Sequence, residues 1–170
     1  VLETYESAQR RGAPILAEVV GYGFSSNGGH ISTPNVEGPA QAMARALANA
    51  SMQASQIDYI NAHATSTPIG DANEAKAIHQ IFGSQTPVSS TKSMTGHLLG
   101  GAGAVEAIFS VLALKDSFVP ATMNYQVKDE ELDLDYVPNK PVKRDIEVGM
   151  SSSLGFGGHN AVLAFRKYKG

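Results

Sequence analysis

The sequence has no cysteine, and only 17% of its 170 residues are charged. Without cysteine the chain can form neither a disulfide framework nor a thiolate zinc site. It also lacks a thiol, which is a strong nucleophile for acyl transfer. Thirteen basic residues stand against sixteen acidic ones, and no run of Lys or Arg is present. Because a phosphate backbone requires clustered positive charge, the composition disfavours nucleic-acid binding.

The N-terminus has neither the pattern of a signal peptide nor that of a transit peptide. Because the first residues resemble the middle of a helix and no Met precedes them, we expect a fragment of a longer protein. One long apolar stretch, residues 98–114, is interrupted only by Glu106 and Ser110. It is short for a bilayer and has a charge at its centre, so we expect a buried helix and no membrane span.

The remaining chain alternates between short β-rich runs and segments with helical spacing of apolar residues. A polar helix end is expected before Gly12. Further helices are expected over residues 39–51, from a cap at Asp71 to residue 82, and over 99–116. Strands are expected over residues 15–24, 57–62, 87–90, 146–154 and 161–165, and a short one over 132–137, whereas 118–130 is irregular. This α/β order predicts one domain with a largely parallel sheet, helices on both faces and a final hairpin.

Polar side chains gather in the loops that follow the expected strands. His30, His63 and His97 each lie after such a strand, and Lys92 stands five residues before His97. Because loops at the carboxyl ends of parallel strands meet at one edge of a sheet, we expect the three loops to converge. Two imidazoles and an ammonium in one cleft can stabilise an oxyanion or an enolate. Alternatively, either histidine serves only to hydrogen-bond or cap its own loop.

Two further features have both a catalytic and a structural interpretation. Glu106 can be the buried partner of Lys92, or it can pair with another donor. Residues 155–158 can direct a backbone N–H toward a reacting carbonyl, or they can form a plain hairpin turn. Metal binding is disfavoured, because no two histidines have ligand spacing on a helix and no cysteine accompanies them. A dinucleotide site at Gly101 and Gly103 is disfavoured as well, because the third glycine of the fingerprint is missing.

Three motifs together carry a family resemblance: NAHATSTP at residues 61–68, STKSMTGH at 90–97 and GFGGHN at 155–160. In this order they resemble the C-terminal signatures of β-ketoacyl-[acyl-carrier-protein] synthases, most closely the chain-elongating KAS II type. The resemblance covers the whole chain. The His/His pair distinguishes it from initiating synthases, which pair His with Asn, and from thiolases, which pair His with Cys.

The resemblance implies a thiolase-like fold made of two similar halves in five layers (αβαβα), of which residues 1–170 are the C-terminal half. This half contains a mixed five-stranded sheet with helices on both faces. The nucleophilic cysteine belongs to the N-terminal half, so this chain alone is expected to be inactive. The apolar helix at 99–116 then needs cover from that other half, and we expect the isolated chain to expose a contiguous apolar patch.

The implied activity is the decarboxylative Claisen condensation of malonyl-carrier protein with an acyl-enzyme thioester in fatty-acid elongation. By resemblance, His63 and His97 drive decarboxylation, and Lys92 with its carboxylate partner Glu106 supports them. Phe156 is the gating residue, and its N–H joins the oxyanion hole. The resemblance places the substrate among Thr65, Thr67, His30, Gly155 and Gly157, the two threonines holding the pantetheine arm.

The resemblance further implies an acyl carrier protein as partner, a cytoplasmic homodimer at full length, and no cofactor beyond the carrier's phosphopantetheine. Two positions differ from the family pattern. Ala64 stands where Gly is usual, so its backbone should avoid positive φ, and Ser32 stands where Thr is common. Two alternatives remain, namely half of a polyketide-type ketosynthase and a non-catalytic partner subunit of the chain-length-factor kind. Met94 and Thr95 favour fatty-acid synthesis over the first, and the two histidines argue against the second.

Overall fold

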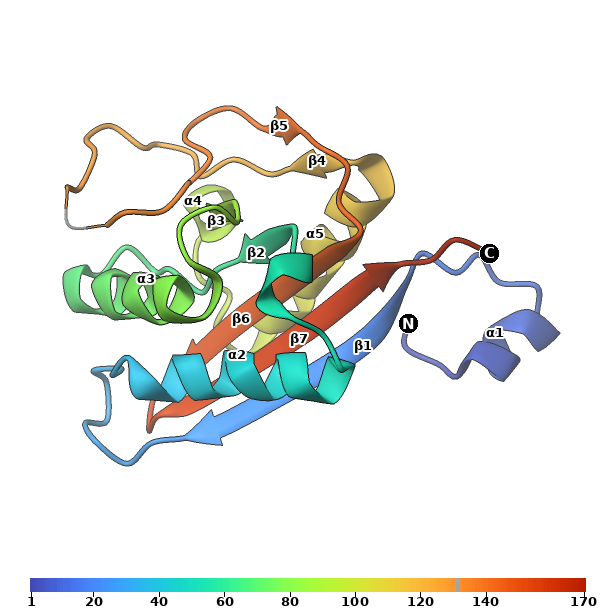
Figure 1. Ribbon diagram of the computed structural model, residues 1–170, viewed down its shortest axis with the longest axis horizontal. Helices are drawn as coiled ribbons and strands as arrows, with labels where there is room; N and C mark the ends of the chain where they lie inside the picture. The colour runs from blue at the N-terminus through green and yellow to red at the C-terminus, as the bar shows by residue number, and fades with distance from the viewer. Residues whose placement is uncertain (131) are drawn as a thin grey trace.

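The computed structural model describes residues 1–130 and 132–170 (Figure 1). Its helices are α1 (Tyr5–Arg10), α2 (Glu37–Ala50), α3 (Pro68–Phe82), α4 (Lys92–Thr95) and α5 (Ala102–Asp116), with 3-10 turns η1 (Ala54–Gln56) and η2 (Leu99–Gly101). Its strands are β1 (Ala17–Ser26), β2 (Tyr59–Asn61), β3 (Val88–Ser89), β4 (Phe118–Val119), β5 (Val142–Lys143), β6 (Val148–Gly155) and β7 (His159–Lys167).

Five strands form one mixed sheet in the order β1-β7-β6-β2-β3, and β4 pairs with β5 separately. Strand β7 is antiparallel to both β1 and β6, whereas β2 is parallel to β6 and to β3. Four of the five strands therefore point the same way, and their carboxyl ends lie along one edge. The predicted direction of the sheet and its final hairpin are confirmed. The hairpin strand β7, however, lies inside the sheet, between β6 and β1.

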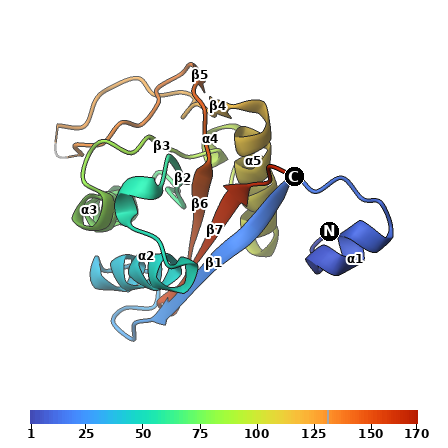
Figure 2. The same cartoon turned by 45° about the vertical axis from the view of Figure 1, so that its right-hand side comes forward.

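Helices cover both faces of the sheet, as predicted. Helices α2 and α3 lie on one side and α5 on the other (Figure 2). The alternation of side chains along β7 builds both cores. Val162 and Ala164 join the cluster under α2 and α3, whereas Phe165 joins the cluster under α5. This is the period-two pattern of a strand buried on both faces.

Helix α2 lies unusually close to the edge strand β1. A Cβ added at Gly23 would stand 1.9 Å from the carbonyl oxygen of Ala42, so a side chain there would push the helix away. This closeness lets α2 reach the outer edge of β1. The side-chain oxygen of Asn49 accepts the N–H of Tyr22 at 3.0 Å, and Arg45 donates to the carbonyl of Phe24 at 2.6 Å.

Several local predictions differ from the structure. Residues 132–137 form no strand. Instead, isolated backbone bonds join Val88 N–H to the carbonyl of Asp135 and Thr122 N–H to that of Val137, and Val137 adopts a φ of 48°, which breaks an extended run. The irregular segment 118–130 begins with the two-residue strand β4. Helix α3 starts at Pro68 after an N-cap at Thr67, so Asp71 lies in its first turn, where it accepts the Ser66 N–H at 3.1 Å.

Helix α5 is covered on only one side. Its residues Ala113 and Leu114 are fully buried, but Ile108 on the outer side is 58% exposed. On β1, Gly21 and Gly23 face α2, so Tyr22 and Phe24 project from the α5 side of the sheet, where both are exposed. The expected uncovered apolar surface is therefore present. Within the described residues, no helix has the length and apolar character needed to cross a bilayer.

Candidate active site

A cleft of about 740 Å³ opens at the edge where the four co-directional strands end. His30 follows β1, His63 follows β2, and His97 follows β3 and α4. All three histidines line this cleft together with Phe156 of the β6–β7 turn. The predicted convergence of the histidine loops is confirmed.

His63 and His97 meet edge to face, with ring centroids 5.3 Å apart and planes at 86°. Nδ1 of His97 accepts the N–H of Leu99 at 3.2 Å, which leaves Nε2 as the nitrogen that can donate into the cleft. Burial, reinforced by the charge of the Lys92 ammonium, lowers the pKa of His63 to about 3. His63 is therefore neutral at physiological pH, as a hydrogen-bonding group for a developing anion must be.

A buried carboxylate fixes the position of the His63 loop. Glu74, in the second turn of α3, accepts the N–H of His63 at 2.9 Å through Oε1 and that of Ala64 at 2.7 Å through Oε2. Its burial raises the pKa of its carboxyl, and the two N–H donors oppose this. Glu74 is not among the site residues expected from the sequence. The available signal was its helical spacing, because Glu74 lies beside Ala75 and one turn before Ile78, both on the buried side of α3.

Lys92 and Glu106 form a buried ion pair across 14 residues of sequence. Their side chains are only 4% and 3% exposed. Burial raises the pKa of Glu106, whereas the Lys92 ammonium opposes the shift by favouring the carboxylate. Oε2 of Glu106 is buried without a hydrogen-bond partner among the described residues. Of the two interpretations left open by the sequence, the pairing with Lys92 is the one observed.

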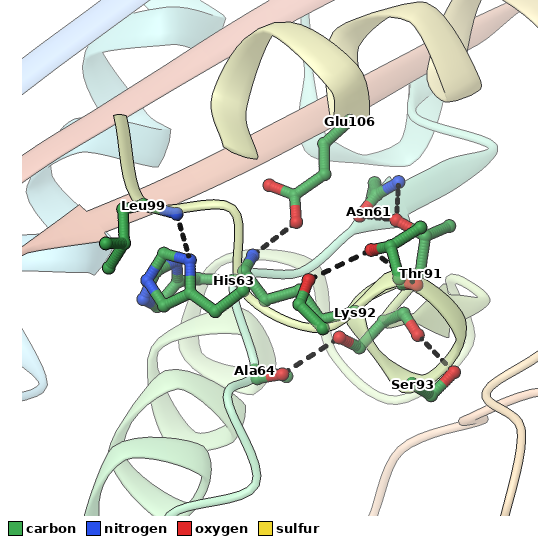
Figure 3. A network of polar contacts seen from close by, with 12 residues as sticks. Asn61, His63, Ala64, Thr91, Lys92, Ser93, Leu99 and Glu106 are labelled. Atoms are coloured by element: carbon green, nitrogen blue, oxygen red, sulfur yellow. Dashed lines mark hydrogen bonds and ion pairs between the residues drawn. The ribbon is translucent and has the colours of Figure 1, made fainter. Parts of the chain in front are cut away.

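Hydrogen bonds also connect the strand ends that carry these groups. Oγ of Ser90 donates to the carbonyl of Ala64 at 2.8 Å, which ties the Lys92 loop to the His63 loop. Nδ2 of Asn61 donates to Oγ1 of Thr91 at 3.2 Å (Figure 3). The chain segments next to His63 and Lys92 are thus hydrogen-bonded to each other, which favours a fixed geometry at this part of the site.

The glycine turn after β6 is connected to the loop that carries His30. Gly157 N–H donates to the carbonyl of Ile31 at 2.7 Å, and Asn27 N–H donates to that of Gly158 at 3.0 Å. Gly158 has a φ of 80°, and an added Cβ would stand 1.7 Å from the Asn27 carbonyl oxygen, so only glycine fits. The Phe156 side chain is 78% exposed and lines the cleft, as does Gly155.

The remaining predicted positions lie on the rim. Thr65 and Thr67 line the cleft, with hydroxyl oxygens 3.4 Å apart. His30 is exposed, and its Nδ1 accepts the N–H of Ser32 at 3.2 Å. Ala64 does not have a positive φ, so the prediction that its backbone avoids this region is confirmed. The nearest residue with a positive φ is Ser66, at 65°.

Comparison with known proteins agrees with this geometry. The family model for the β-ketoacyl synthase C-terminal domain matches residues 16–126. A 3-oxoacyl-[acyl-carrier-protein] synthase 2 of Staphylococcus aureus (strain COL) is 53% identical, covering 99% of this chain and 42% of that protein. The chain thus spans less than half the length of this relative. The KAS II-type resemblance read from the motifs is confirmed.

Solved structures are similar throughout the chain. The ishigamide ketosynthase/chain length factor matches with a TM-score of 0.96 and 40% identity, over 98% of this chain and 42% of that one. A type II PKS acyl-carrier protein in complex with its hexaketide-bound ketosynthase matches with a TM-score of 0.93 and 37% identity, over the same shares. The thiolase-like fold class is confirmed. This chain belongs to the β-ketoacyl synthase family, whose C-terminal domain it carries.

Proposed function

We propose that residues 1–170 form the C-terminal half of a β-ketoacyl-[acyl-carrier-protein] synthase that elongates fatty acids by decarboxylative Claisen condensation. The observation that carries this proposal is the neutral His63, in edge-to-face contact with His97 at a cleft that a thioester can enter. The family membership supports the same reaction class. The nucleophilic cysteine comes from the N-terminal half, because this chain contains none.

In the proposed reaction, the cysteine is acylated first and the malonyl thioester then enters the cleft. The bond between the α-carbon and the carboxylate breaks, CO₂ leaves, and the electron pair remains as an enolate. Nε2–H of His97 donates to the enolate oxygen, and the neutral His63 stands beside it as the second stabilising group. The enolate carbon attacks the acyl-cysteine carbonyl, and collapse of the tetrahedral intermediate releases the cysteine thiolate.

Other residues support these two histidines. Lys92, paired with Glu106, places a fixed positive charge near His63 and keeps that imidazole neutral. The Phe156 N–H contributes to the oxyanion hole of the condensation step, and its side chain gates the cleft. The substrate is bound among Thr65, Thr67, His30, Gly155 and Gly157, and the two threonines hold the pantetheine arm.

The partners follow from the uncovered surface. The outer side of α5 and the exposed side chains of β1 are covered by the N-terminal half, and two complete chains form a cytoplasmic homodimer. The substrates arrive on an acyl carrier protein, and the similar ketosynthase solved with its acyl-carrier protein supports this assignment. The similarity to a ketosynthase/chain length factor keeps polyketide-type substrates as an alternative.

The experiment compares His63→Ala and His97→Ala in the full-length synthase. In each variant the rate of malonyl-carrier-protein decarboxylation should fall roughly a hundredfold or more. Acylation of the cysteine by a carrier protein loaded with a saturated acyl chain should continue. The purified 170-residue chain should form no ketoacyl product. Ser84→Ala, on the far side of the domain, is the matched control for the two histidine variants. Full-rate decarboxylation by either histidine variant would contradict the proposal.

A further inference from the structure

A second cavity lies beside the His63 loop, on the side away from the cleft. It has a volume of about 600 Å³ and is bounded by α3, by residues 122–127 and by residues 134–136. The walls of this cavity and of the cleft have Ala64, Thr65, Asp71, Glu74 and His97 in common. The loop at residues 64–65 thus separates two spaces that both border His97. We call the second space the rear chamber.

The deep wall of the rear chamber is built from small and apolar side chains. Ala62 and Ala75 leave the space open, and Ile78 and Val88 line it. All four are buried. These four side chains give the part of the chamber behind the His63 loop an apolar lining.

The chamber also contains a polar group that requires a partner. The hydroxyl of Tyr136 is buried and has no hydrogen-bond partner among the described residues. Burial raises the pKa of this phenol, so it stays protonated and acts as a donor. Because buried hydroxyls are almost always hydrogen-bonded, the Tyr136 hydroxyl makes this part of the chamber suited to a water molecule or another acceptor.

The outer wall reaches the surface. Val127, on the chamber rim, is 83% exposed. The wall is attached by a few hydrogen bonds rather than by the sheet. Met123 N–H donates to Oγ of Ser93 at 2.8 Å, and Nδ2 of Asn139 donates to the carbonyl of Tyr125 at 2.6 Å. Small molecules can pass such a boundary more readily than they can cross the packed core.

The chemistry supplies a reason for a second opening. If the proposed function holds, the carrier-bound thioester occupies the cleft while its α-carbon loses CO₂. The CO₂ is released next to His63 and His97, with the cleft blocked by the substrate arm. We propose that the rear chamber is the exit through which CO₂ leaves the reaction centre and exchanges with water. The step needs no further reactant, because the electron pair stays on the enolate and neutral CO₂ departs.

The first test is crystallographic and does not depend on catalysis. Crystals of the full-length synthase are pressurised with xenon in one set and with CO₂ in another. Density in the rear chamber, between Ala75 and Ile78, is expected with both gases. A chamber that stays free of both would overturn the proposal, whatever the enzyme's activity.

The second test fills the chamber. Ala75→Leu adds a side chain at a wall position that belongs to the chamber and not to the cleft. Lys76→Leu adds the same side chain at the next, exposed position of α3 and is the matched control. Ala75→Leu should lower net decarboxylation several-fold and leave cysteine acylation unchanged, whereas Lys76→Leu should change neither.

The ¹³C isotope effect at the malonyl carboxyl separates blocked exit from structural damage. When CO₂ departs slowly, the enolate recaptures it, so the isotope effect should fall toward unity in Ala75→Leu. Misplaced histidines would instead slow the cleavage of the carbon–carbon bond and leave the isotope effect fully expressed, and that result would refute the exit role. An unchanged decarboxylation rate in Ala75→Leu would refute it as well. A wild-type synthase that never decarboxylates malonyl-carrier protein would refute the proposed function instead, leaving the xenon result to stand by itself.

Discussion

The Lys92–Glu106 pair gives the most quantitative prediction. Both side chains are almost completely buried, and they contact each other directly. Replacing Lys92 with Met keeps the aliphatic volume but leaves the Glu106 carboxyl in an apolar environment without its cation. Breaking a buried pair from one side typically costs about 3–5 kcal/mol, because the remaining charge is uncompensated. Replacing both partners with apolar residues is often neutral or even stabilising.

We therefore expect Lys92→Met to lower the free energy of unfolding of the full-length synthase by about 3–5 kcal/mol. The double variant Lys92→Met/Glu106→Met should recover most of that loss. The assay is equilibrium urea unfolding near pH 7, with Lys115→Met, on the exposed last turn of α5, as the control. A single variant as stable as the wild type, or a double variant no better than the single one, would refute the assigned pairing.

The remaining predictions concern the His63 loop. Because the pKa of His63 is lowered to about 3, its imidazole should stay neutral from pH 8 to 5, and a ¹⁵N chemical shift that titrates near pH 6.5 would contradict this. Since the unfolded chain binds this proton near pH 6.5, the stabilising contribution of neutral His63 is complete above that pH, declines below it and is lost near pH 3, as acid-unfolding curves of wild type and His63→Ala should show. Glu74→Gln leaves one of two backbone N–H groups without an acceptor, so it should cost about 1–3 kcal/mol and slow decarboxylation at least about tenfold; wild-type kinetics in that variant would show that the loop holds itself.

The long elements were predictable from the sequence because each has a clear period. Helix α5 and strands β1, β6 and β7 all appear within a few residues of the expected ranges. The two-residue strands β4 and β5 were missed, whereas the equally short β3 lies within the strand expected at 87–90. The expected strand at 132–137 was wrong, because its alternation of apolar and acidic residues is also produced by an irregular segment that exposes its carboxylates.

The site was predictable where polar side chains stand in loops after strands and unpredictable where they only hold the backbone. His63, Lys92 and His97 stand out in sequence because they are polar residues in loops that follow strands. Glu74 does not, because a carboxylate on a helix normally lies in solvent, and its role depends on two N–H groups of a loop 10 and 11 residues away. Connections of that kind are set by the tertiary fold.

The contacts between α2 and the edge strand β1 have a consequence for association. An edge strand of 10 residues presents unpaired N–H and C=O groups to which another strand can add. Asn49 and Arg45 occupy two of these groups, so an incoming chain would first have to displace them. Helix α2 reaches this edge only because Gly23 lets it approach. Gly23 therefore helps to protect the edge strand from fibril-like pairing with another chain. A larger residue at Gly23 should reopen the edge, so the tolerance of this position is set by solubility as much as by packing.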